Sequence, residues 1–251
     1  MPKIRAGIIN VTGYIGAELA RILCQHPQVE LVTVTGRSAA GQKLGDVFPS
    51  FAGTKYTIEA ELDSETDIAF SAMPHKSSAE VILPLLKQGI KVVDASADFR
   101  LKNADEYPKW YGFTHPSPEL LREAVFGLPE LHGSEIASAS LIANPGCYST
   151  GAILALAPIV REGLITPDIV VDSKSGVSGA GRTLGLTTHY SEVNENICAY
   201  SLGGHRHLPE MEQELKALNP SISPSITFVP HLVPTIRGIL STCYARLRDD
   251  K

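Results

Sequence analysis

The chain has 251 residues, of which 43% are hydrophobic, 20% charged and 6% aromatic, so it can bury a substantial core and is not a disordered or fibrous polymer. Lys and Arg number 22 against 27 Asp and Glu, and the net charge of −5 lacks the basic footprint of a nucleic-acid-binding protein. No apolar run reaches the roughly 18–20 residues of a membrane span, and no signal peptide is recognisable. We therefore expect a cytoplasmic protein with neither a nucleic-acid nor a membrane partner. Four scattered cysteines without metal-ligand spacing predict no metal site.

Strand-like apolar runs alternate with helical patterns through the first half of the chain. Strands are expected at 4–9, 31–35, 67–73 and 91–95, and helices at 17–25 and 78–88. The strand residues are apolar on successive positions, which is typical of a parallel sheet covered by helices on both faces. Residues 98–131 lack a long periodic segment, so we expect them to form a surface excursion.

The second half has a different pattern. A short strand at 140–143 precedes an apolar helix that reaches Val160, and further strands are expected at 169–172, 226–229 and 239–247, with a helix at 210–218. We predict an α/β protein with a Rossmann-type parallel-sheet domain over 1–145 and an α+β catalytic domain over 146–251. The second domain is expected to be incomplete at its C-terminus, because the chain stops four residues after the last strand.

A glycine turn follows the first expected strand and precedes a helix, which is the order found in dinucleotide-binding units. Gly13 and Gly16 would let the backbone approach a pyrophosphate at the helix N-terminus. Asn10 stands where a third glycine would complete the turn, and asparagine tolerates positive φ better than most residues. An ordinary tight turn is the alternative interpretation. The residues assigned to the cofactor here are Thr12, Gly13, Tyr14, Ile15 and Gly16.

Gly36, Arg37 and Ser38 follow the second expected strand. A carboxylate at this place would hold the ribose 2′-hydroxyl of NAD, whereas an arginine accommodates the 2′-phosphate of NADP. The sequence therefore favours NADPH, with Arg37 and Ser38 as ligands. A solvated loop arginine is the alternative.

Cys147 follows an Asn-Pro-Gly turn that begins at Asn144 and precedes the apolar helix. Unpaired N–H groups at a helix N-terminus stabilise a thiolate, so Cys147 is a candidate nucleophile; an inert cysteine beside a core helix is the alternative. His205 and His207 flank Arg206 at the start of the helix at 210–218 and could supply an acid or base for such a thiol. A metal-ligand pair and solvated histidines are the alternatives.

A second glycine-rich loop, 173–182, could hold a phosphate or the nicotinamide edge, or could be a flexible connector. Ser178 and Gly179 are assigned to the cofactor, and the flanking Lys174 and Arg182 to the substrate. Arg237 is assigned to anionic substrate groups on its charge and loop position alone, and Asn144 and His207 are further substrate candidates.

Taken in order, eight segments resemble the N-acetyl-γ-glutamyl-phosphate reductases of arginine biosynthesis, with aspartate-semialdehyde dehydrogenase as a broader relative. These segments are 11–16, 74–75, 94–100, 143–148, 175–182, 189–196, 204–207 and 230–234. The resemblance covers essentially the whole chain and implies a semialdehyde-dehydrogenase type of catalytic and dimerisation domain.

The resemblance makes Cys147 the nucleophile, His205 the acid/base and His207 a supporting residue. It implies a small acyl phosphate as substrate, a cysteine thioester as intermediate, NADPH as cofactor and a homo-oligomer. Three departures are Asn10 for a glycine, Ser149 for a proline, and the lack of the family's C-terminal segment. The alternatives are the lysine-pathway N-acyl-aminoadipyl-phosphate reductase and a catalytically weak nucleotide-binding or assembly module.

Overall fold

A computed structural model describes residues 2–248 and divides into two compact units between Asn144 and Pro145, so each unit is described by itself. Among these residues, no helix is both long and apolar enough to cross a membrane.

The first unit is built on a seven-stranded sheet in the order β3-β2-β1-β4-β5-β7-β6, in which every paired neighbour is parallel. The strands are β1 (Ile4–Ile9), β2 (Val29–Thr35), β3 (Ile58–Glu59), β4 (Ile68–Ser71), β5 (Lys91–Asp94), β6 (Val125–Phe126) and β7 (Leu141–Ala143). The strand order changes direction between β1 and β4. In sheets of this kind, ligands bind at the carboxyl ends of the strands at such a switch point.

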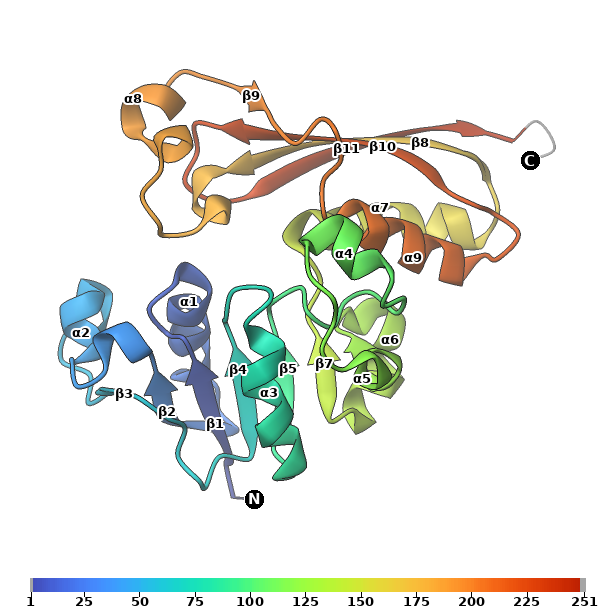
Figure 1. Cartoon of the computed structure of the whole chain (residues 1–251). Helices are drawn as coiled ribbons and strands as arrows, with labels where there is room; N and C mark the ends of the chain where they lie inside the picture. Colours follow the sequence, from blue (N-terminus) through green and yellow to red (C-terminus); the bar gives the residue numbers. More distant parts are fainter. Residues whose placement is uncertain (1, 249–251) are drawn as a thin grey trace. The chain divides into compact units, whose positions relative to one another are not determined.

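Helices cover both faces of this sheet (Figure 1). They are α1 (Tyr14–Leu23), α2 (Leu44–Val47), α3 (Ser78–Lys87), α4 (Glu106–Tyr111), α5 (Pro118–Glu123) and α6 (Pro129–Ser138), with short 3-10 turns η1 (Arg37–Ala39) and η2 (Pro49–Phe51). One buried cluster contains Ile8 with α1 and α2, and another contains Ile9 with α3, α4 and α5. Consecutive strand residues point to opposite faces, so the two clusters lie on opposite sides of the sheet. The predicted α/β fold is confirmed.

The prediction that residues 98–131 form a surface excursion is wrong. This segment contains α4, α5 and β6, and its aromatic side chains enter the core: Phe99 and Tyr107 are fully buried, and Tyr107 packs against Tyr111 with ring centroids 5.5 Å apart. Short helices and ring stacking supply the burial that a long periodic helix would otherwise provide, and periodicity does not detect them.

The second unit has a mixed sheet in the order β11-β8-β10-β9, with β8 and β10 parallel and the outer strands antiparallel to their neighbours. Its strands are β8 (Ile165–Gly176), β9 (Cys198–Ala199), β10 (Ser225–Val233) and β11 (Ile239–Leu247). Helices α7 (Cys147–Arg161) and α9 (Leu208–Leu218) pack together on one face (Figure 1). An excursion between β8 and β9 carries η3 (Val177–Ala180), η4 (Leu186–Thr188) and α8 (Tyr190–Val193).

Candidate active site

The turn between β1 and α1 has the geometry of an anion-binding loop. Asn10 adopts φ 64°, the left-handed conformation that a glycine would otherwise supply. A Cβ added to Gly16 would lie 2.5 Å from the Asn10 carbonyl oxygen, so the helix packs on the loop only with glycine there. A Cβ added to Gly13, the N-cap of α1, would meet nothing within 4 Å. The space beside Gly13, at the start of α1, is therefore open, which fits a pyrophosphate bound at this helix N-terminus.

Arg37 and Ser38 lie in η1, directly after β2, and both are exposed. The preceding Gly36 faces the glycine turn, because a Cβ there would lie 3.0 Å from Thr12 Cγ2. The end of β2 thus brings an exposed guanidinium to the neighbourhood of the turn, within the same unit.

The 94–100 segment is a buried scaffold beneath the loops of the first unit. The Asp98 carboxylate accepts hydrogen bonds from the N–H groups of Lys76, Ser78 and Ala79 at 2.6–3.1 Å and so fixes the start of α3. Arg100 Nε donates to the carbonyl oxygen of Asn144 at 2.7 Å. This bond fixes the backbone of Asn144 at the end of the first unit.

Cys147 is the first residue of α7 and is exposed, with Gly146 as N-cap. A Cβ at Gly146 would lie 2.6 Å from Nε2 of His207, so glycine allows the histidine ring to sit against the backbone beside Cys147. The Gly146 N–H donates to the fully buried Glu210 carboxylate at 2.8 Å. The N-termini of α7 and α9 therefore meet beside Cys147. Ser149 fits this junction, since its hydroxyl is buried and donates to the His207 carbonyl oxygen at 3.4 Å.

His205 is only 9% exposed and is held in one orientation. The His207 backbone N–H donates to its Nδ1 at 3.0 Å, and the rings of Tyr148 and Phe228 stand edge-on to it at 5.5 and 5.3 Å. Burial, with a smaller contribution from the Arg206 charge, lowers the His205 pKa to about 4. The imidazole is therefore neutral at pH 7, and because Nδ1 accepts a hydrogen bond, its proton is on Nε2.

A tyrosine pair adjoins these groups. The Tyr200 hydroxyl donates to the Tyr148 hydroxyl at 2.9 Å, and the Tyr200 ring lies 5.8 Å from that of His205. Burial raises the pKa of Tyr200, and its bond to Tyr148 and the charges of Tyr148 and Cys147 raise it further. The Cys147 sulfur is thus within electrostatic reach of the pair. Sequence reasoning missed both Tyr200 and Glu210; the only signal was their closeness in the chain to the histidine segment.

The structure places the remaining predicted residues unevenly. Ser178 and Gly179 lie in η3, where the Val177 and Ser178 N–H groups bond to carbonyls of 235 and 236, so this loop lies beside Arg237. Arg182 is exposed shortly after it. Lys174 ion-pairs with Asp172 on the sheet face opposite to its buried neighbours Ser173 and Ser175. Tyr148 packs on the face that α7 covers, so the structure does not bring Lys174 together with Cys147.

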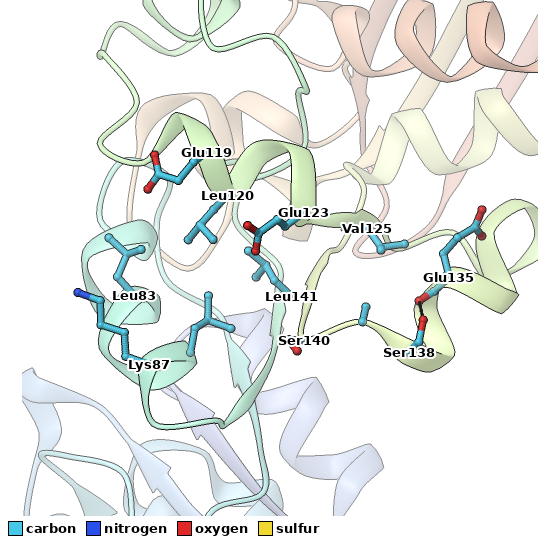
Figure 2. Close-up of a pocket in the computed structure, with 12 residues that line it drawn as sticks. Leu83, Lys87, Glu119, Leu120, Glu123, Val125, Glu135, Ser138, Ser140 and Leu141 are labelled. Atoms are coloured by element: carbon cyan, nitrogen blue, oxygen red, sulfur yellow. Dashed lines mark hydrogen bonds between the residues drawn. The ribbon is translucent and has the colours of Figure 1, made fainter.

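Away from these residues, the first unit has a groove of about 680 Å³ that Figure 2 shows. Leucines of α3 and α5 line it, and among its lining residues the three carboxylates of Glu119, Glu123 and Glu135 outnumber the single ammonium of Lys87. Excess negative charge disfavours a dinucleotide or an acyl phosphate. We therefore assign the candidate cofactor and catalytic residues to the loops described above, after β1 and β2 and at the start of α7, and not to this groove.

Two family models match the chain. The semialdehyde dehydrogenase NAD-binding domain matches residues 5–139, and the semialdehyde dehydrogenase dimerisation domain matches residues 147–251. The fold and the matched domains define the class of protein: the chain belongs to the semialdehyde dehydrogenase family.

Curated relatives narrow the family further. The N-acetyl-γ-glutamyl-phosphate reductase of Dehalococcoides mccartyi strain 195 is 57% identical to this chain, over 99% of the chain and 73% of the relative. That of Moorella thermoacetica is 50% identical, over 97% of the chain and 72% of the relative. The chain is a member of the N-acetyl-γ-glutamyl-phosphate reductase family and spans about three quarters of the length of these relatives.

Solved structures show the same fold at low identity. Aspartate semialdehyde dehydrogenase II from Vibrio cholerae matches 98% of this chain and 75% of its own with a TM-score of 0.72 at 18% identity. The Candida albicans aspartate semialdehyde dehydrogenase, solved with NADP, matches 98% of this chain and 72% of its own with a TM-score of 0.69 at 16% identity.

Proposed function

We propose that this chain catalyses the NADPH-dependent reduction of N-acetyl-γ-glutamyl phosphate to N-acetylglutamate 5-semialdehyde and phosphate, a step of arginine biosynthesis. The observation that carries the proposal is the junction of α7 and α9. An exposed cysteine begins α7, and the ring of the next residue, Tyr148, stands 5.5 Å from that of the buried, neutral His205. Family membership supports the substrate, since close relatives carry the name of this activity.

The open turn at Gly13 fits the cofactor's pyrophosphate, and residues Thr12 to Gly16 would hold it. Arg37 and Ser38 would bind the 2′-phosphate, and Ser178 and Gly179 the nicotinamide end. When bound, NADPH supplies the hydride that reduces the thioester carbonyl. Asn144, His207, Arg182 and Arg237 are assigned to the substrate, whereas Lys174 is set aside because its ammonium is paired on the opposite face of the sheet.

Cys147 and His205 divide the chemistry between them. The Cys147 thiolate forms a bond to the acyl carbon, the C–O bond to phosphate breaks, and a thioester remains. After reduction, His205 donates its Nε2 proton to the oxygen of the hemithioacetal and takes it back as the C–S bond breaks and the aldehyde forms. An acid/base of this kind contributes roughly 10²–10⁴-fold, so its loss is severe without being total.

The test is NADP- and phosphate-dependent oxidation of N-acetylglutamate semialdehyde by the purified chain. We expect turnover by the wild type and none by Cys147→Ser, which retains NADPH binding. Cys198→Ser, a matched change at another exposed cysteine of the second unit, is expected to keep the activity.

Mass spectrometry of the enzyme mixed with the acyl phosphate locates the thioester. An acyl group on Cys24, Cys198 or Cys243 would overturn the assignment. NADPH binding without turnover would favour the nucleotide-binding module, and faster turnover of the aminoadipyl analogue would favour the lysine-pathway enzyme.

We also propose that the homo-oligomer forms through the sheet face of the second unit that α7 and α9 leave uncovered. Leu240 and Tyr244 are 67% and 57% exposed there, and Tyr244 lies opposite Val170 on the neighbouring strand. The match of residues 147–251 to a dimerisation domain supports a second copy of this chain as the partner. Light scattering is expected to show that Tyr244→Glu reduces the assembled mass, while Ile22→Glu, at a similarly exposed site on α1, leaves it unchanged.

A further inference from the structure

The side chain of Asn10, in the loop that follows β1, bonds to the loop that follows β4. Backbone pairing between these strands ends where the Ala72 N–H donates to the Ile9 carbonyl oxygen at 2.9 Å. Asn10, the residue directly after β1, adopts the left-handed backbone conformation. The Asn10 side-chain Nδ2 then donates to the Ala72 carbonyl oxygen at 2.9 Å. The Asn10 side chain thus extends the hydrogen bonding between β1 and β4 by one bond, beyond the point where backbone pairing ends.

Both loops are also fixed at other points. On the β2 side, the Val11 N–H donates to the Thr35 carbonyl oxygen at 2.8 Å, and Thr12 Oγ1 donates to Asn10 Oδ1 at 3.2 Å. The loop after β4 is held at its far end, where the Lys76 N–H donates to the Asp98 carboxylate. The hydrogen bond from the Asn10 side chain to Ala72 connects the two loops directly, at the point where the strand order changes direction.

We propose that Asn10 is a positioning residue for the dinucleotide, which fixes the spacing of these two loops before the cofactor binds. The proposal rests on the proposed function, since it assigns a role within the same cofactor site. A glycine at position 10 would allow the same φ but could not form the bond to Ala72. Asn10 is therefore not a weakened version of a glycine turn: it keeps the turn and adds rigidity, and rigidity present in the free protein lowers the cost of ordering on binding.

The central variant is Asn10→Gly, which allows the same backbone conformation and removes the side-chain amide, and with it both the bond to Ala72 and the bond from Thr12. One neutral hydrogen bond contributes about 0.5–1.5 kcal/mol, so we expect NADPH affinity to fall about 2- to 12-fold. The KM for NADPH should rise by a similar factor with kcat unchanged, because the reacting groups are elsewhere. Asn10→Asp keeps the acceptor for Thr12 and lacks the donor, so it should not restore binding.

Hydrogen exchange of the nucleotide-free protein separates positioning from general stability. In Asn10→Gly, amides of 11–13 and those of 73 and 75–77 should exchange faster together, while those of α9 do not change. Glu195→Gly is the matched control, since Glu195 is also a non-glycine residue with φ 57° but lies in the second unit. It should alter neither NADPH affinity nor exchange in the two loops.

Two results would overturn the proposal: equal NADPH affinity of Asn10→Gly and the wild type, or faster exchange confined to 11–13. If the wild type itself fails to bind NADPH, the proposed function fails. The exchange experiment contains no nucleotide, so it still decides whether Asn10 joins the loops.

Discussion

His205 shows how burial sets the chemistry of a single residue. Its pKa is lowered to about 4 because the charged ring loses hydration, and the His207 N–H on Nδ1 fixes the tautomer. The same burial makes the residue a source of acid sensitivity. A folded-state pKa below the unfolded value of about 6.5 means that the unfolded chain binds more protons between pH 6.5 and 4.

Stability should therefore fall as pH falls through this window. Between pH 7 and pH 5, His205 alone is expected to lower the free energy of unfolding by about 2 kcal/mol. Urea unfolding followed by circular dichroism at both pH values checks this for the wild type and His205→Gln. The variant should lose about 2 kcal/mol less on acidification; an equal loss in both proteins would contradict the pKa assigned to His205.

Arg37 is the residue on which cofactor choice depends in our proposal. Its guanidinium is exposed after β2, and no carboxylate stands in Gly36-Arg37-Ser38. A charge-assisted bond to phosphate contributes about 1.5–3 kcal/mol, so Arg37→Ala should weaken NADPH binding roughly 10- to 150-fold and leave NADH binding nearly unchanged. Titration of both cofactors measures this. Arg21→Ala, which removes the same charge at the far end of α1, is the control, and equal binding of NADPH and NADH by the wild type would contradict the assignment.

At the scale of elements, the site depends on the junction of two helix N-termini. Gly146 makes the junction possible, because a methyl group there would lie 2.6–2.7 Å from three atoms of the His207 ring. No side chain tolerates such a distance without movement of the helix or the ring. Its N–H also satisfies the buried Glu210 carboxylate, so one backbone position links α7 to α9.

Gly146→Ala should therefore displace His207 and the start of α9, lowering both the melting temperature and kcat. Gly151→Ala in the same helix is the matched control, since its Cβ would meet only Ser241 Oγ at 3.7 Å. Replacing glycine by alanine inside a helix stabilises by roughly 0.5–1 kcal/mol, so this variant should melt higher with unchanged kcat. Comparable melting temperatures and kcat for the two variants would contradict the proposed junction.

At the scale of the whole molecule, the chain divides into two compact units, and the glycine turn after β1 and the cysteine–histidine junction belong to different units. The chain's single tryptophan, Trp110, lies in the first unit beside its aromatic cluster. Tryptophan fluorescence therefore reports the unfolding of the unit that carries the glycine turn.

We expect NADPH to shift this fluorescence transition to higher urea. A ligand at 100 times its Kd stabilises the state that binds it by about 2.7 kcal/mol. The shift should be much smaller in Arg37→Ala at the same concentration. A fluorescence midpoint insensitive to NADPH would show that the first unit is not the main binding unit.

Local pattern was sufficient for much of the architecture. Every expected strand of the first unit forms, within a few residues, because runs buried on both faces have an apolar signature that needs no knowledge of neighbours. The turn at Asn10 could also be predicted from the sequence, since tolerance of positive φ is a property of asparagine itself. The structure gives Asn10 a φ of 64°. The family resemblance followed from the order of motifs along the chain.

Tertiary structure decided what depends on residues far apart in sequence. The burial of 98–131 came from ring packing across short helices. The Glu210 bond to Gly146 spans 64 residues, and the Asn10 bond to Ala72 spans 62. Such contacts are set by which elements meet in space, and a periodic pattern describes only one element at a time.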